Sequence, residues 1–183
     1  FEDCVEGMRE RLDDDSVDMV FTSPPYNIEK TQRRDERANP DVVPYTDDRT
    51  DGEFREWLSS VFAEVSRVLK PSGHAFINLD HRIVEGQVTQ SDWIVDCVPI
   101  PWRSYIIWDK PQVTDFDANN SGRFYTNWEP IYHFSENPSA LNGSKNHGVW
   151  TIQPVTGADR QITEPHPAPF PEELVYRAID ATT

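Results

Sequence analysis

A long amphipathic helix that leads through a proline–glycine turn into an apolar strand constrains the fold of this chain most. Apolar side chains recur every three or four positions and so share one helical face: Phe54, Trp57, Leu58, Val61, Phe62, Val65, Val68 and Leu69. Thr50 and Glu53 have the spacing of an N-terminal capping box, and Pro71 and Gly73 are expected to end the helix. The apolar segment 74–80 then reads as a strand. A helix that returns to a buried strand is the second half of a βαβ unit, so the sequence predicts an α/β fold.

The other predicted elements continue the alternation of helices and strands. We expect helices over residues 3–12, 91–98 and from Pro171 onward, and strands over residues 17–21, 104–110, 129–136 and 149–154. The strand at 17–21 should be buried, and the last helix should bury Leu174, Val175, Ala178 and Ile179. Residues 27–50 and 111–127 are polar and lack periodicity, which indicates long loops of the kind that often carry function.

Length and composition limit the class of protein. With 183 residues, 37% of them hydrophobic, the chain has material for one α/β domain with a sizeable core. No apolar run approaches the roughly 18 residues that span a membrane, and no secretory signal opens the sequence. The two cysteines, Cys4 and Cys97, are far apart and the five histidines are scattered, so neither a disulfide framework nor a metal site is expected. A cytoplasmic protein is the default expectation.

The net charge of −15 argues superficially against a nucleic-acid partner, because binding to phosphates needs cationic side chains. The acidic residues are, however, spread over loops and helix faces instead of forming a tail. That distribution is typical of a solvated surface adapted to high salt, where screening shortens electrostatic interactions. Net charge therefore does not decide the partner.

The segment TSPPYN, residues 22–27, follows the first predicted strand directly. Each proline fixes its own backbone angle and keeps the preceding residue extended, so Ser23–Pro24–Pro25 should form a rigid hook. The Ser23 oxygen and the Pro24 carbonyl would then be two acceptors beside the ring of Tyr26. Such a site suits a planar base with an NH₂ group, since both amine protons are accepted while the ring stacks and the nitrogen lone pair points outward to attack a methyl group. A polyproline ligand for a partner domain is the alternative interpretation.

This hook resembles the catalytic motif of the DNA amino-methyltransferases, which methylate cytosine N4 or adenine N6 with S-adenosylmethionine. Stretches similar to other motifs of that family occur in the same order, at residues 3–27, 58–79, 106–110 and 166–179. The resemblance implies a Rossmann-like methyltransferase fold, a mixed sheet with the cofactor at its carboxyl edge. It also implies that the partner is double-stranded DNA whose target base is flipped into the site.

The resemblance assigns roles to particular residues. The catalytic hook that would hold the base comprises Ser23, Pro24, Pro25 and Tyr26. Cofactor contacts would come from Asp3, Pro167 and Phe170, although Asp3 could instead simply cap the first helix. Position along the chain, in addition to the resemblance, suggests contacts to DNA from Asn27 at the margin of the hook, from Lys30, Arg33 and Arg34 just after it, and from Arg123 in the loop 111–127. The basic cluster after the hook could equally be a solvated charge run, and the loop with Arg123 an ordinary surface loop.

One family motif is absent from the sequence. The glycine-rich cofactor loop, of the form F-x-G-x-G, occurs nowhere in residues 1–183, and the order of the other motifs predicts it just past Thr183. We therefore expect an incomplete methyltransferase domain over residues 1–183, lacking the glycine-rich strand and loop. Residues 28–50 and 111–148 should contain the target-recognition loops.

Several functions fit these motifs. The first is a site-specific DNA methyltransferase, in a restriction–modification pair with a cognate endonuclease or as an orphan enzyme. Serine at position 23 favours cytosine N4 over adenine N6 by family resemblance. The alternative is a non-catalytic nucleic-acid-binding remnant, or a partner-dependent fragment without its own cofactor loop. An amine on RNA or on a protein side chain is a third possibility.

Overall fold

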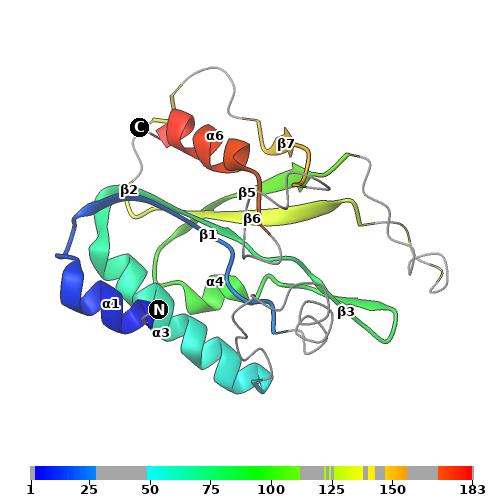
Figure 1. Ribbon diagram of the computed structural model, residues 1–183, viewed down its shortest axis with the longest axis horizontal. Helices are drawn as coiled ribbons and strands as arrows, with labels where there is room; N and C mark the ends of the chain where they lie inside the picture. The colour runs from blue at the N-terminus through cyan, green and yellow to red at the C-terminus, as the bar shows by residue number, and fades with distance from the viewer. Residues whose placement is uncertain are drawn as a thin grey trace.

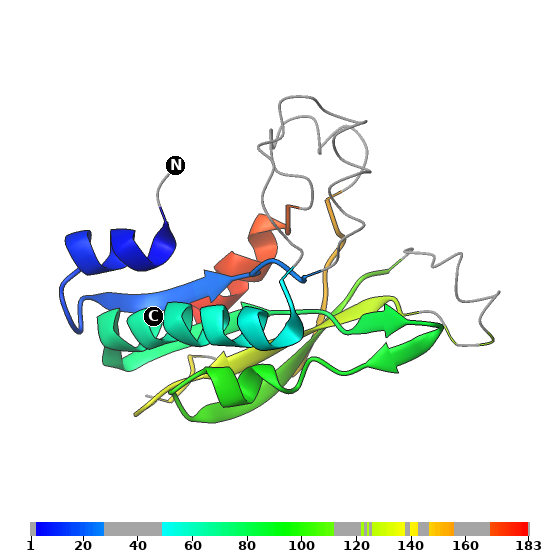
Figure 2. The same ribbon diagram turned by 90° about the horizontal axis from the view of Figure 1, so that it is seen from below.

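A mixed five-stranded sheet separates helices on its two faces (Figures 1 and 2). This computed structural model describes residues 3–27, 49–111, 122, 124, 126–137, 140–142, 147–155 and 169–182. The strands of the sheet are β1 (Val17–Thr22), β2 (Leu69–Asn78), β6 (Trp128–Phe134), β5 (Trp102–Asp109) and β7 (Val149–Thr151), in that spatial order. β1 is parallel to β2, β6 is antiparallel to both β2 and β5, and β7 is parallel to β5. The predicted α/β architecture is confirmed.

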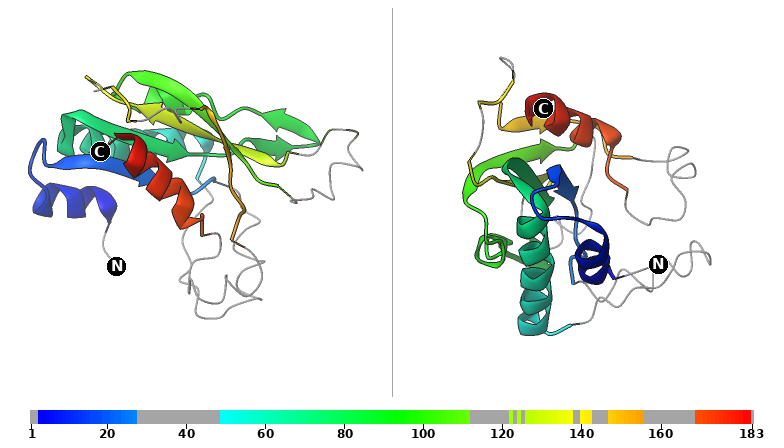
Figure 3. Two further views of the ribbon diagram at one scale, coloured as in Figure 1. Left: turned by 90° about the horizontal axis from the view of Figure 1, so that it is seen from above. Right: turned by 90° about the vertical axis from the view of Figure 1, so that its left-hand side faces the viewer.

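Helices α1 (Cys4–Arg11), α3 (Asp51–Val68) and α4 (Ile94–Cys97) lie on one face of the sheet, and α6 (Glu172–Thr182) lies on the other (Figure 3). Alternation along β2 explains the division. Ala75 and Ile77 belong to the apolar cluster that includes Phe62 of α3, whereas Phe76 belongs to the cluster that includes Leu174 of α6. Each face of β2 thus carries its own core.

The α3–β2 unit forms as the sequence predicts. Thr50 caps α3 through a complete capping box with Glu53, and the helix buries Phe54, Leu58, Phe62, Val65 and Val68. At its end Arg67 binds Glu64, Asp14 and the carbonyls of Leu12 and Met8. These bonds tie the end of α3 to α1 and to the turn that leads into β1, which fixes where β1 and its hook begin.

Two expectations about the first parallel pair were wrong in detail. β2 begins at Leu69, before the proline–glycine turn, because Leu69 already pairs with Val17. The register then jumps from Val17–Leu69 to Met19–His74, so the segment from Lys70 to Gly73 bulges out within the strand. The strand expected to be buried, β1, is only half-buried, because it forms the edge of the sheet among the described residues.

Other differences are small. The helix expected over 91–98 contains only one turn, α4. α6 begins at Glu172, one residue after Pro171, and of its four predicted core residues Leu174 and Ala178 are fully buried. A hairpin of β3 (Arg82–Val84) and β4 (Gln87–Thr89) was not predicted; Glu85 and Gly86 connect its strands with positive φ angles of 51° and 77°. No helix within the described ranges is long and apolar enough to cross a membrane.

Candidate active site

The proline hook lies at the edge of the sheet where β1 and β2 end. β1 stops at Thr22, and Ser23–Pro24–Pro25–Tyr26 continues as irregular backbone with Pro24 buried. Because β6 runs opposite to β2, its first residues lie at this same edge, and so do the last residues of β5. The ends of four strands therefore meet beside the hook, as ligand sites in open α/β sheets usually require.

The Tyr26 hydroxyl is the centre of a small polar network. Its oxygen lies 3.2 Å from Ser23 Oγ, 3.3 Å from Asn78 Oδ1 at the end of β2 and 3.3 Å from Glu129 Oε2 at the start of β6. The ring of Tyr26 packs against the apolar cluster on the α3 face. Burial, followed by the negative charge of Glu129, raises the pKa of Tyr26 well above its usual value. Tyr26 is therefore a neutral hydroxyl, able to pass on a hydrogen bond.

The donor and acceptor groups of Asn78 and Glu129 decide the direction of the hydrogen bonds that Tyr26 makes. Asn78 is 2% exposed, and its Nδ2 donates to the Pro130 carbonyl at 3.1 Å, so its Oδ1 faces Tyr26 as an acceptor. An ionised Glu129 also only accepts. Tyr26 therefore donates a hydrogen bond to one of these two groups and accepts a hydrogen bond from Ser23. The lone pairs of Ser23 then stay available to accept from a substrate amine.

Two carboxyl groups and one lysine surround this network. Glu129 Oε1 lies 2.5 Å from Lys110 Nζ, and their side chains are 15% and 12% exposed. Asp80 follows β2 and receives the His81 backbone N–H at 2.8 Å. Burial, and then the charge of Glu129, raises the pKa of Asp80 to about 7, while Lys110 opposes the shift. A half-buried acidic pair with one compensating lysine thus lies behind the hook.

Asn27 ends the hook and turns the chain away. Its φ of 56° lies in the left-handed region, which asparagine tolerates better than most residues. Its Nδ2 donates to the Arg49 carbonyl at 2.8 Å and so links the hook to the start of α3. Its Oδ1 is buried without a hydrogen-bond partner among the described residues. Asn27 therefore supports the hook from α3, and its contact with DNA stays a prediction.

The predicted cofactor residues lie on elements of opposite faces. Asp3 caps α1, with Oδ1 accepting from the Val5 and Glu6 N–H groups at 2.9 and 3.2 Å. Phe170 precedes α6 on the other face, and its ring centroid lies 5.2 Å from that of Phe21 on β1. Phe170 therefore adjoins β1, whereas the hydrogen bonds of Asp3 are to its own helix, α1. Their cofactor contacts stay predictions, and Pro167 lies outside the described residues.

Most of the predicted DNA contacts fall on parts of the chain that the structure does not describe. Lys30, Arg33, Arg34 and Arg123 lie outside the described residues, as do most of the recognition segment 28–50 and part of 111–148. Within the described ranges, no cluster of three or more histidine, cysteine, aspartate or glutamate side chains is arranged to hold a metal ion.

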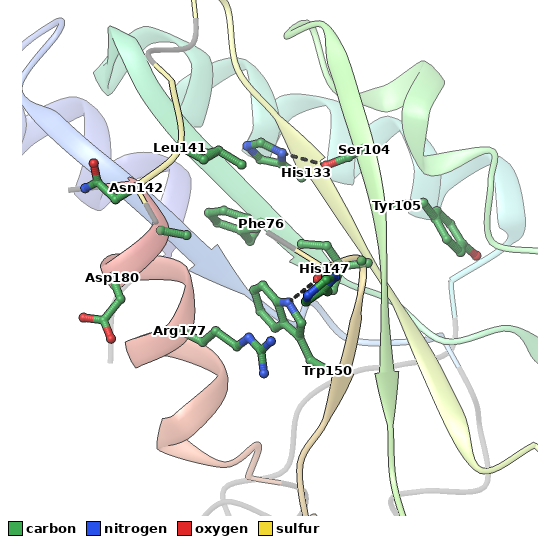
Figure 4. A pocket seen from close by; sticks show the side chains of 13 residues that line it. Phe76, Ser104, Tyr105, His133, Leu141, Asn142, His147, Trp150, Arg177 and Asp180 are labelled. Carbon is green, nitrogen blue, oxygen red and sulfur yellow. Dashed lines mark hydrogen bonds between the residues drawn. The ribbon is translucent and has the colours of Figure 1, made fainter. Parts of the chain in front are cut away.

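A separate cavity of about 550 Å³, whose lining includes none of the hook residues, lies beside α6 (Figure 4). Phe76, Trp150, Ser104 and His133 are among its lining residues. His133 Nδ1 lies 2.9 Å from Ser104 Oγ, and its Nε2 lies 2.9 Å from His74 Nδ1. Burial lowers the pKa of His133 to about 4, so this serine–histidine pair is neutral at neutral pH. Among the described residues, no carboxylate is hydrogen-bonded to His133 to complete a serine–histidine–carboxylate triad. The hook is therefore the stronger candidate site in this part of the chain.

Four residues beside the hook were not predicted from the sequence: Asn78, Asp80, Lys110 and Glu129. Each was present in a segment expected to be a strand, or immediately next to one. The available signal was their position at strand ends, because polar residues there lie at the edge where ligands bind. Using it would have required the order and direction of β5 and β6, which single-segment patterns do not provide.

The sequence as a whole matches the N6/N4 methyltransferase family, described as DNA methylase, over residues 17–183. It is 28% identical to the type II methyltransferase M.BglII of Bacillus subtilis, over 94% of this chain and 52% of that protein. It is 27% identical to the type II methyltransferase M.SfiI of Streptomyces fimbriatus, over 67% of this chain and 32% of that protein. The chain therefore spans about half the length of M.BglII and about a third of M.SfiI.

Solved structures share the fold. The PvuII DNA methyltransferase, described as cytosine-N4-specific, superposes with a TM-score of 0.71 at 20% identity over 100% of this chain and 69% of that chain. A putative DNA modification methylase of Thermus thermophilus, in complex with S-adenosyl-L-methionine, gives 0.60 at 20% identity over 97% and 72%. The expected methyltransferase fold is thus confirmed. Because the family match runs from residue 17 to residue 183, this chain belongs to the DNA methylase family.

Proposed function

We propose that the protein transfers a methyl group from S-adenosylmethionine to an exocyclic amine of a base in double-stranded DNA, with cytosine N4 as the first candidate and adenine N6 as the second. The proposal rests on Ser23. Its Oγ donates a hydrogen bond to Tyr26 Oη at 3.2 Å, so the lone pairs of Oγ stay available to accept from an amine. The base would have to be flipped out of the duplex to reach the hook at the sheet edge. The cytosine-N4-specific description of the PvuII enzyme supports the choice of base.

The residues at this edge fit the cofactor in part. S-adenosylmethionine supplies an electrophilic methyl group on a cationic sulfonium, and the carboxyl groups of Asp80 and Glu129 beside the hook favour a cation there. Phe170 and Phe21 supply apolar surface next to β1. The glycine-rich loop expected for the rest of the cofactor is absent from residues 1–183. Because M.BglII and M.SfiI are type II methyltransferases, a cognate endonuclease is the partner we propose.

The test uses the full-length protein that contains this chain. DNA is incubated with it and S-adenosylmethionine, digested to nucleosides and analysed by mass spectrometry. We expect N4-methylcytosine. Finding only N6-methyladenine would overturn the choice of base, and finding no methylated nucleoside would favour the non-catalytic alternative.

Ser23→Ala tests the role of the hook in the same assay. It removes one acceptor for the amine protons, so the single-turnover rate is expected to fall about 100-fold. Ser60→Ala is the matched control, because Ser60 lies exposed on α3 and bonds only its own helix at the Trp57 carbonyl. Equal rates for Ser23→Ala and Ser60→Ala would contradict the assigned role.

A further inference from the structure

Methylating an amine creates a proton that must leave. As the amine nitrogen bonds to the methyl carbon, the carbon–sulfur bond of the donor breaks with its electron pair on sulfur. The nitrogen becomes cationic and must lose one of its two protons to give a neutral methylamine. Ser23 is a poor final acceptor for this proton, because a hydroxyl that gains a proton must release another. A complete site therefore needs a destination beyond Ser23.

The hydrogen bonds behind the hook all point in one direction. Ser23 Oγ donates to Tyr26 Oη at 3.2 Å, and Tyr26 Oη donates to Glu129 Oε2 or Asn78 Oδ1 at 3.3 Å. Of these two acceptors only the Glu129 carboxylate is able to keep a proton, since an amide oxygen is not a base near neutral pH. The route from the amine to a base is thus already hydrogen-bonded, and Asn78 helps to orient Tyr26 within it.

We propose that Ser23, Tyr26 and Glu129 form a proton relay that removes the amine proton during methyl transfer, with Glu129 as its terminal acceptor and Lys110 as the residue that positions Glu129. This inference rests on the proposed function. Ser23 takes the amine proton and gives its own proton to Tyr26, which gives its hydroxyl proton to Glu129. One proton moves at each step, and no group other than Glu129 changes its charge within the relay.

The surroundings of Glu129 fit this role. Its second oxygen, Oε1, is bonded to Lys110 at 2.5 Å, which holds the carboxylate in place and leaves Oε2 directed at Tyr26. The side chain is 15% exposed, so the proton reaches it through the tyrosine more directly than through bulk water. When it is ionised, Asp80 adds negative charge near Tyr26 and so favours movement of a proton inward.

Tyr26→Phe is the decisive variant, because it keeps the ring and removes only the hydroxyl. In the full-length protein, with its DNA and S-adenosylmethionine, we expect the single-turnover rate to fall at least about tenfold, while binding of DNA and cofactor stays unchanged. Tyr105→Phe is the matched control: Tyr105 is a partly buried tyrosine on β5 whose ring packs edge to face against Tyr132, away from the relay. A role of Tyr26 in stacking alone would leave Tyr26→Phe as fast as Tyr105→Phe.

Two further measurements separate a relay from a loss of structure. Glu129→Gln keeps the shape of the side chain and should slow methyl transfer about as much as Tyr26→Phe does. The double variant with both changes should be no slower than the slower single variant, because both residues serve one relay. The parent should show a solvent deuterium isotope effect on methyl transfer that declines towards one in Tyr26→Phe. Thermal unfolding checks that Glu129→Gln, which removes the ion pair with Lys110, still folds; if it does not, Tyr26→Phe decides alone.

The outcomes are distinguishable from those of the proposed function. A parent protein that methylates no amine in DNA would overturn the proposed function and the relay together. A parent that is active, with Tyr26→Phe at full rate and an unchanged isotope effect, would overturn the relay alone.

Discussion

At the scale of single residues, Asp80 shows how the fold changes the chemistry of a side chain. In the sequence it is one acidic residue among many on an acidic chain. In the structure it follows the buried β2 strand, and its pKa is raised to about 7 by burial and by the charge of Glu129. Keeping this carboxyl group ionised therefore destabilises the folded state, and that cost depends on pH.

The pH dependence of stability tests this shift. The folded state binds the Asp80 proton more tightly than the unfolded state, whose pKa is near the ordinary 3.8. The favourable contribution is fully present below about pH 4 and is lost as pH rises through about 7. Asp80→Asn has no such proton, so its free energy of unfolding relative to wild type should rise by about 2 kcal/mol between pH 5 and pH 8. Urea unfolding at the two pH values measures it, and a difference that does not change with pH would contradict the shift.

The hook shows what residue-level prediction achieved. Ser23, Pro24 and Tyr26 were predicted from the sequence as hook residues, because consecutive prolines restrict the backbone independently of the rest of the fold. The partners of Tyr26 were not recognised. Asn78 and Glu129 lie 52 and 103 residues away along the chain; the pairing of β1 with β2 brings Asn78 to the hydroxyl, and the pairing of β2 with β6 brings Glu129.

At the scale of elements, the proline–glycine segment of β2 is the clearest case in which tertiary contacts altered a predicted boundary. The signal for a helix end was correct, since α3 stops at Val68. However, Leu69 already pairs with Val17 before the turn, so β2 starts earlier than expected and then bulges. A bulge of this kind depends on the neighbouring strand, which the local sequence does not specify.

Gly73 makes this bulge testable. A Cβ atom at Gly73 would lie 2.9 Å from the backbone oxygens of Asp18 and Lys70 and from Leu69 Cγ. Gly73→Ala is therefore expected to lower the free energy of unfolding by about 1–3 kcal/mol. Gly52→Ala in α3 is the control: a Cβ there meets nothing within 4 Å, so it should leave stability unchanged or raise it by about 0.5–1 kcal/mol. Urea unfolding compares the two, and equal effects would show that the close approach at Gly73 is not as described.

At the scale of the whole molecule, the dominant feature is the net charge of −15. Repulsion among like charges opposes the compact state, and salt screens it. We expect the free energy of unfolding to rise when KCl is increased from about 0.1 to about 1 M, where the Debye length falls from about 10 to about 3 Å. Urea unfolding at both salt concentrations measures the change. A decrease would mean that surface ion pairs such as Lys70–Asp18 and Arg82–Asp51 outweigh the repulsion.

The sequence by itself determined the α3–β2 unit, the hook at residues 23–26 and the resemblance to DNA amino-methyltransferases. Periodicity, capping and proline geometry act over a few residues, so they can be read without the fold. Only the tertiary structure decided that β1 lies at the edge of the sheet formed by the described residues, that β6 lies between β2 and β5, and that Asn78, Asp80, Lys110 and Glu129 surround Tyr26. Those facts depend on strand order and direction, which arise from packing between segments far apart in the chain.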